Sequence, residues 1–86
     1  MAAQSMAPIS DVIPAQAVSP LALWRMEHGM TQAQLAAAAG AKLSEVRAAE
    51  EGHTGLVGEL QDYLTEQGEN VSEMASRQSA FIAGRR

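Results

Sequence analysis

The chain contains no cysteine in its 86 residues. That absence excludes a disulfide scaffold, a thiolate zinc site and a cysteine nucleophile. Long apolar runs are also missing, because none approaches the roughly 20 residues that a bilayer crossing needs. The N-terminus lacks the basic start and the continuous apolar stretch of a signal peptide. We therefore expect a soluble cytoplasmic protein with no membrane partner.

Aromatic residues are scarce, at 3% of the chain, and are limited to Trp24, Tyr63 and Phe81. Apolar residues reach 47%, but many of them are alanines, whose side chains bury little surface. A chain of this length has room for one small domain and has little core with which to stabilise it. These limits favour a single all-helical domain.

Positive charge is in deficit, and the net charge is −4. Such a balance argues against a general nucleic-acid coat, which needs many cations to neutralise phosphates. It is still compatible with a compact reader of DNA that uses a few local cations. The acidic residues are concentrated in residues 59–73, whereas residues 74–86 are basic.

Helix start and stop signals are clear in the first half of the chain. The first helix is expected from Ser19, a good N-cap followed by proline, to about His28. The second is expected to begin at Thr31, which forms a capping-box pair with Gln34, and to end at Gly40. The alanines of this second helix allow another helix to approach it closely.

Three more helical segments follow. The third is expected over residues 43–51. Because Lys42 cannot accept hydrogen bonds from helix N–H groups, Ser44 is an alternative cap that would shift the helix start by about two residues. Apolar residues recur at helical spacing over residues 56–64 and predict the fourth helix. Ser72 is expected to cap the fifth.

The two ends of the chain differ from its helical part. Residues 1–18 hold Pro8 and Pro14, which prevent the apolar side chains of this segment from sharing one helix. We interpret the segment as a flexible leader, with a short arm that docks on a partner as the alternative. Residues 19–83 form the expected domain with its C-terminal helix, and residues 84–86 form a basic tail.

Residues 25–52 resemble the helix-turn-helix domains of lambda-repressor-like (XRE-type) regulators of bacteria, phages and plasmids, and the likeness extends over about residues 19–75. The resemblance implies a compact five-helix lambda-repressor-like domain, all-α, with the helix-turn-helix at its second and third helices. The positions that match in order and spacing are Arg25, Gly29, Thr31, Gln32, Leu35, Ala36, Gly40, Val46, Glu50 and Gly52.

Three of the matched positions also have a physical reason of their own. Ala36 is small enough for the second and third helices to cross closely. Gly40 lies where the chain turns sharply and a positive φ is useful. Val46 anchors the third helix to the core and leaves the opposite face of that helix exposed. An exposed helix held in this way fits the major groove of B-DNA.

Gln32 is a candidate phosphate contact. It lies at the start of the second helix, where backbone N–H groups and the helix dipole favour an anion. The family resemblance implies that it clamps the DNA backbone. The alternative interpretation is a solvated glutamine in the first turn of a helix.

The groove-facing positions of the family are occupied by Lys42, Leu43, Ser44, Arg47 and Ala48. Arg47 is the best candidate base reader, because its fork can bind guanine O6 and N7 together. Lys42 is expected near a phosphate and Ser44 at a base edge. Ala48, and with it Leu43, can contact a thymine methyl group. The alternative is a solvated helix face with Leu43 folded inward.

Two further sets of residues have expected structural roles. The resemblance implies a salt bridge between Arg25 and Glu50, so Arg25 is not counted among the DNA-binding cations. In the last helix, Met74, Phe81 and Ile82 exceed what a minimal helix-turn-helix core needs. These three residues either form a homodimer interface or close the core.

Groups suited to catalysis or metal binding are lacking. His28 and His53 are too far apart in sequence to form a helical metal pair, and no cysteine joins them. The acidic residues 59–73 match an outward helical face, and the sequence has neither a glycine-rich phosphate loop nor a Ser/His/Asp group. We therefore expect a protein that is not an enzyme and that has no cofactor or metal.

Together, these observations predict a small sequence-specific DNA-binding transcriptional regulator. A repressor that acts as a homodimer on a double-stranded operator in a promoter fits best. The alternative is a protein-interaction module of antitoxin-like or antirepressor-like type, which the acidic fourth helix and the apolar leader favour. An antitoxin that binds both DNA and a protein partner is a third possibility.

Overall fold

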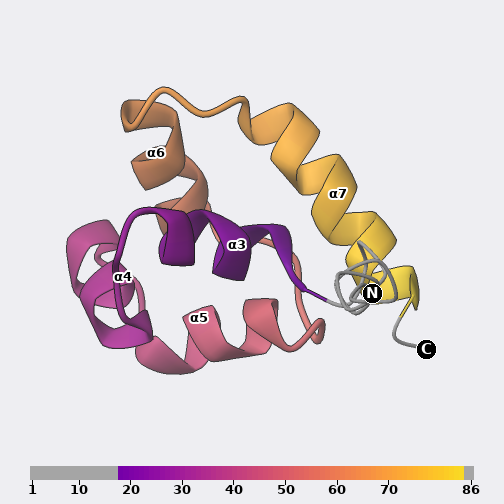
Figure 1. Cartoon of the computed structure of the whole chain (residues 1–86), viewed down its shortest axis with the longest axis horizontal. Helices are drawn as coiled ribbons and strands as arrows, with labels where there is room; N and C mark the ends of the chain where they lie inside the picture. Colours follow the sequence, from indigo (N-terminus) through magenta and orange to yellow (C-terminus); the bar gives the residue numbers. More distant parts are fainter. Residues whose placement is uncertain (1–17, 85–86) are drawn as a thin grey trace, which may run out of the picture.

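The computed structural model describes residues 18–84, and in this part of the chain all regular structure is helical (Figure 1). The all-helical expectation is confirmed for these residues. The helices are α3 (Pro20–Glu27), α4 (Gln32–Ala39), α5 (Leu43–Glu50), α6 (Gly58–Glu66) and α7 (Val71–Gly84).

The expected terminal segments fall largely outside the described residues. Of the expected leader over residues 1–18, only Val18 is described. Gly84, expected to begin a basic tail, is instead the last residue of α7. Residues 85–86 of that tail lie outside the described part of the chain.

The first two described helices begin at the predicted caps. The Ser19 hydroxyl accepts a hydrogen bond from the Ala22 N–H at 2.9 Å, which starts α3. Thr31 Oγ1 accepts from the Gln34 N–H at 3.0 Å, and Gln34 Oε1 accepts from the Thr31 N–H at 2.8 Å. This reciprocal capping box satisfies two N–H groups that the helix itself leaves without partners.

The start of α5 decides between the two predicted caps. The helix begins at Leu43, with Lys42 at the cap position, so the alternative start near Ser44 is not adopted. Glu45 Oε1 accepts from the Lys42 N–H at 3.0 Å. The Lys42 side chain cannot accept a hydrogen bond from a helix N–H. The Glu45 carboxylate, in the first turn, therefore stabilises the helix start in its place.

The predicted cap of the last helix is wrong. Asn70 Oδ1 accepts from the Glu73 N–H at 3.1 Å, so Asn70 caps α7 in place of Ser72. Helix α7 consequently begins at Val71. Asparagine and serine are similarly good caps, and the sequence places both at the start of this helix.

The five helices of residues 18–84 enclose one core. Helix α3 contacts α5 and α7, α4 contacts α5 and α6, and α6 contacts α7. A short connection places α4 beside α5, and α4 lies at the end of the molecule opposite to α7 (Figure 1). Over the described residues, every helix is too short or too polar to cross a lipid bilayer.

The core draws at least one side chain from each helix. Leucines from α3, α4 and α6 are fully buried at its centre, and Trp24 packs edge-on against Tyr63 with ring centroids 5.9 Å apart. Such aromatic pairs add to the stabilisation from burial. The core cluster consists of Leu21, Trp24, Leu35, Ala36, Val46, Ala49, Leu56, Leu60, Leu64 and Met74.

Candidate nucleic-acid interface

Helices α4 and α5 are joined by a tight turn at Gly40. This glycine has φ 72° and ψ 24°, a left-handed conformation that costs other residues energy. The Ala41 N–H donates to the Ala36 carbonyl at 2.9 Å and closes the helix end. Ala36 is 5% exposed, and its small side chain lets the two helices pack closely, as the sequence predicts.

Only one face of α5 is held by the core. Val46 and Ala49 are fully buried, while Ser44 and Arg47 on the opposite face are exposed. Lys42, at the cap of the helix, is exposed as well. The outer face of α5 is therefore exposed at its cap and over its first half, as far as Arg47. We call Lys42, Ser44 and Arg47 the α5 polar face.

The remaining two predicted groove residues are less accessible. Leu43 is partly buried and packs against the core cluster, in agreement with the inward-folded alternative. Ala48 is half-buried. Of these two, Ala48 is the one whose side chain is not engaged with the core.

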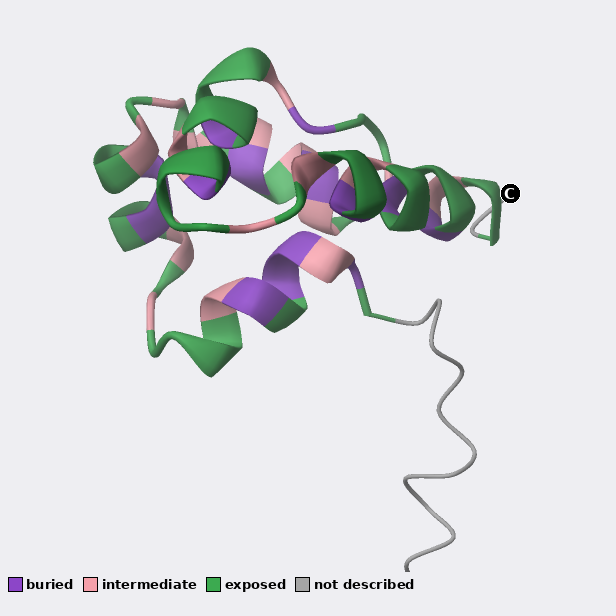
Figure 2. Ribbon diagram, turned by 90° about the horizontal axis from the view of Figure 1, so that it is seen from above, coloured by how far each residue is buried: buried purple, intermediate pink, exposed green. Residues whose placement is uncertain are grey.

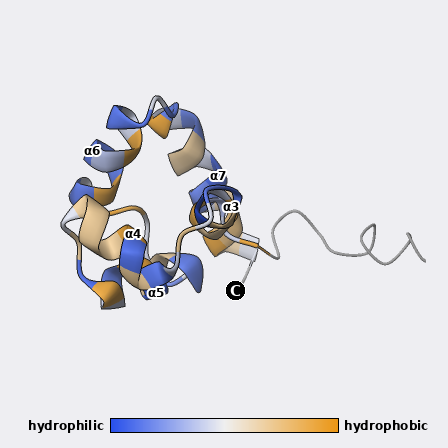
Figure 3. Cartoon of the chain, turned by 60° about the vertical axis from the view of Figure 1, so that its left-hand side comes forward, coloured by the Kyte–Doolittle hydropathy of each residue, from blue (hydrophilic) through white to orange (hydrophobic). Residues whose placement is uncertain are grey.

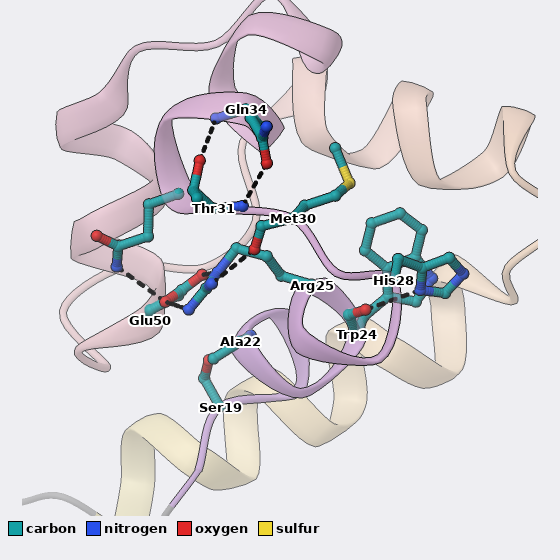
Figure 4. A network of polar contacts seen from close by, with 10 residues as sticks. Ser19, Ala22, Trp24, Arg25, His28, Met30, Thr31, Gln34 and Glu50 are labelled. Atoms are coloured by element: carbon teal, nitrogen blue, oxygen red, sulfur yellow. Dashed lines mark hydrogen bonds and ion pairs between the residues drawn. The ribbon is translucent and has the colours of Figure 1, made fainter.

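The expected ion pair between Arg25 and Glu50 is present and joins α3 to the last residue of α5 (Figure 4). Arg25 Nε donates to Glu50 Oε2 at 2.7 Å, and Nη2 donates to Oε1 at 3.0 Å. Arg25 Nη1 also donates to the Met30 carbonyl at 2.9 Å. The guanidinium thus holds the α3–α4 connection and α5 together, and it is not available to a phosphate.

The hydrogen bond to Glu50 raises the pKa of Arg25 above its ordinary value, although burial acts in the opposite direction. A raised Arg25 pKa means that the pair stabilises the fold from neutral pH up to the ordinary pKa of arginine. This contribution is lost as the pH rises past the pKa of Arg25 in the folded state.

Gln32 belongs to the same network. Its Nε2 donates to Glu50 Oε1 at 2.9 Å, so the first residue of α4 is tied to the last residue of α5. The side chain is half-buried, which differs from the solvated alternative. Its amide carries a second N–H and an oxygen beyond this bond.

The charges around the α5 polar face nearly cancel. Lys42 and Arg47 supply two cations, and Glu51 beyond the end of the helix is an exposed acid. Glu45 is half-buried with one oxygen on the Lys42 N–H. The α5 polar face therefore carries two cationic side chains, and it has no extended region of positive potential.

Sequence reasoning missed Gln78 of α7. This side chain is 1% exposed, and its Nε2 donates to the Ala49 carbonyl at 2.8 Å and to the Thr54 carbonyl at 3.0 Å. It links α7 to the C-terminal end of α5. A polar residue between Met74 and Phe81 on the inward face of a helix was the available signal.

The predicted dimer residues of α7 divide into two groups. Met74 and Phe81 are 8% and 2% exposed, so these side chains close the core, which was one of the two expected roles. Ile82 is half-buried. Burial in the single chain leaves Met74 and Phe81 little surface for a second copy.

Residues 18–84 contain no group of three or more His, Cys, Asp or Glu side chains placed to hold a metal ion. A comparison of the chain with protein-family models, with curated proteins and with solved structures finds no match.

Proposed function

We propose that this chain is a sequence-specific DNA-binding regulator with a lambda-repressor-like fold, in which α4, the turn and α5 form the helix-turn-helix. It acts as a repressor, as a homodimer that covers a promoter operator. The observation that carries the proposal is the one-sided attachment of α5. Its inner face is fully buried at Val46 and Ala49, while the α5 polar face is exposed. A helix held in this way can enter a major groove.

Each residue of the α5 polar face then has a role set by its chemistry. Arg47 binds guanine O6 and N7 with its two-pronged guanidinium, and Ser44 bonds to a base edge. Lys42 neutralises a phosphate. Ala48 contacts a thymine methyl group, whereas Leu43 is assigned to the core.

Gln32 contributes a phosphate contact from the start of α4. Its Nε2 is oriented by Glu50 at 2.9 Å, and its remaining amide N–H is the donor to the DNA backbone. With two exposed cations on the interface, each subunit releases few counterions, and one subunit binds DNA weakly. A dimer that reads two half-sites raises the affinity.

The test is fluorescence anisotropy with DNA from immediately upstream of the protein's own gene, against scrambled DNA, at several salt concentrations. Arg47→Ala should weaken specific binding about 5- to 100-fold, as expected for losing one bidentate base contact. Arg77→Ala is the matched control, because it removes the same charge from an exposed site on α7. Equal binding by the two variants refutes the assignment of α5 to the groove.

A second candidate function rests on α6. Glu59, Asp62 and Glu66 are exposed on this helix, which is hydrophilic along most of its length (Figure 3). An acidic face of this kind suits a basic protein partner, as in an antitoxin-like module. Capture of one basic partner protein that weakens as the salt concentration rises, together with no specific DNA binding, favours this function over the first.

A further inference from the structure

The exposed large apolar side chains of the described residues lie within one short stretch of the sequence, residues 18–26. Val18, Leu23 and Met26 are 38%, 48% and 53% exposed, and they are the large hydrophobic residues with the greatest exposure there. Leu23 and Met26 lie one helical turn apart on α3, and Val18 directly precedes the Ser19 cap. We call Val18, Leu23 and Met26 the α3 stripe.

The α3 stripe has no part in the core or in the proposed DNA site. The core side of α3 consists of Leu21, Ala22 and Trp24. The helix forms one side of the molecule, with α5 and α7 packed on its inner face (Figure 2). Neighbouring exposed apolar side chains on one side of a small domain are a candidate interaction surface.

We propose that the α3 stripe binds the α3 stripe of a second copy of this chain, with the two helices antiparallel about a two-fold axis. In such an interface the same patch meets itself. We place the two-fold axis at the level of Ala22. Val18 and Met26 are each four residues from Ala22, so the Val18 of each copy meets the Met26 of the other copy. Leu23 then lies beside the axis and packs against Leu23 of the other copy.

The charges at the ends of the stripe favour the same arrangement. Antiparallel pairing brings the exposed Glu27 of each copy to the N-terminal end of α3 in the other copy. That end carries the positive part of the helix dipole, and the first turn of α3 holds no acidic residue. A parallel pairing would instead place the two Glu27 carboxylates together.

The size of the stripe sets the strength of this dimer. Three partly exposed side chains bury far less than the roughly 800 Å² per partner of a standard stable interface. The dissociation constant therefore lies in the high micromolar to millimolar range, and the pairing matters when two chains are bound side by side. This dimer rests on the proposed function, in which two copies bind one operator. Because the dimer is tested without DNA, a negative result would disprove the α3 pairing and leave operator binding as a separate question.

The experiment uses disulfide trapping in the 86-residue chain, whose sequence has no cysteine to interfere. Under mild copper–phenanthroline oxidation, Leu23→Cys should form a covalent dimer with itself. Val18→Cys mixed with Met26→Cys should give more covalent dimer than either variant alone. Gln67→Cys, exposed at the end of α6, is the control for random collision.

Sedimentation equilibrium gives an independent measurement. The mass of the wild type should rise with concentration, whereas Leu23→Glu should need at least about tenfold more protein for the same dimer fraction. Gln67→Glu adds the same charge away from the stripe and should behave as wild type, and far-ultraviolet circular dichroism checks that each variant is folded.

Two results overturn the proposal. The first is a wild type that stays monomeric up to about 1 mM, with Leu23→Cys trapped no more than the control. The second is a monomeric Leu23→Cys chain whose thiol resists a maleimide, because residues 1–17 of the same chain would then cover the stripe.

Discussion

Gln32 donates from Nε2 to Oε1 of Glu50 at 2.9 Å, and this bond ties the start of α4 to the end of α5. The same carboxylate accepts two bonds from Arg25. One carboxylate therefore fixes the relative placement of three helices. The residues proposed to contact DNA from α4 and α5 depend on it for their spacing.

Arg25→Met should lower the free energy of unfolding by about 2–4 kcal/mol, because it leaves the Glu50 carboxylate without its cation. The two side chains are only 16% and 7% exposed. Arg77→Met is the matched control, since the Arg77–Glu73 pair is 62% and 59% exposed and should contribute no more than about 0.5 kcal/mol. Urea unfolding measures both variants, and losses of equal size would contradict this account.

The same comparison has a predicted pH dependence. The pKa of Arg25 is raised by its bond to Glu50, so the guanidinium keeps its charge in alkaline solution. The stability difference between wild type and Arg25→Met should therefore stay constant from neutrality to about pH 10. A stability difference that shrinks over this range would contradict the prediction that Arg25 stays charged and keeps its ion pair with Glu50.

Gln32→Ala separates the two roles of this glutamine. Glu50 keeps its bonds to Arg25, so the loss of unfolding free energy should be about 0.5–1.5 kcal/mol. Operator affinity should fall several-fold, because the phosphate contact is lost. Gln67→Ala, which removes an exposed amide beyond α6, should change neither quantity. A stability loss without any effect on DNA binding would make Gln32 a purely structural residue.

Local signals accounted for most of the fold. The Ser19 cap and the Thr31–Gln34 capping box were predicted because each acts within one turn of helix. The start of α7 was misplaced because Asn70 and Ser72 are both good caps, and only the surrounding chain decides between them.

Features of the site that arise within one helix were predicted, whereas a contact between residues far apart in the sequence was missed. Helical periodicity alone places Ser44 and Arg47 on the outer face of α5. Leu43, at the first turn of that helix, lies between the two faces, and packing decides its direction. Gln78 escaped detection because both of its partners are backbone carbonyls, 29 and 24 residues away in sequence. Every residue has a backbone carbonyl, so the residue types at positions 49 and 54 do not indicate that their carbonyls accept these bonds.

Gly40→Ala should lower the free energy of unfolding by about 1–2 kcal/mol. An added Cβ there meets nothing within 4 Å, so the loss is due only to the left-handed backbone at φ +72°. Gly40→Asn should lose less, because asparagine tolerates this conformation better. Gly55→Ala is the control: its Cβ also meets nothing, and its φ is not left-handed. It should be neutral or stabilise slightly, and thermal unfolding that ranks Gly55→Ala below Gly40→Ala would disprove the argument.

Gln78 offers the sharpest test of how α7 supports α5. Gln78→Met keeps the volume but leaves the carbonyls of Ala49 and Thr54 without their donor, so the free energy of unfolding should fall by about 1–3 kcal/mol. Gln78→Glu should lose more, because it buries a carboxylate that faces two carbonyl oxygens. Ser79→Ala on the exposed side of α7 should stay within about 0.5 kcal/mol of wild type. If methionine and glutamate both leave the stability unchanged, the two hydrogen bonds contribute little, and the packing of α7 against α3 and α6 holds it in place.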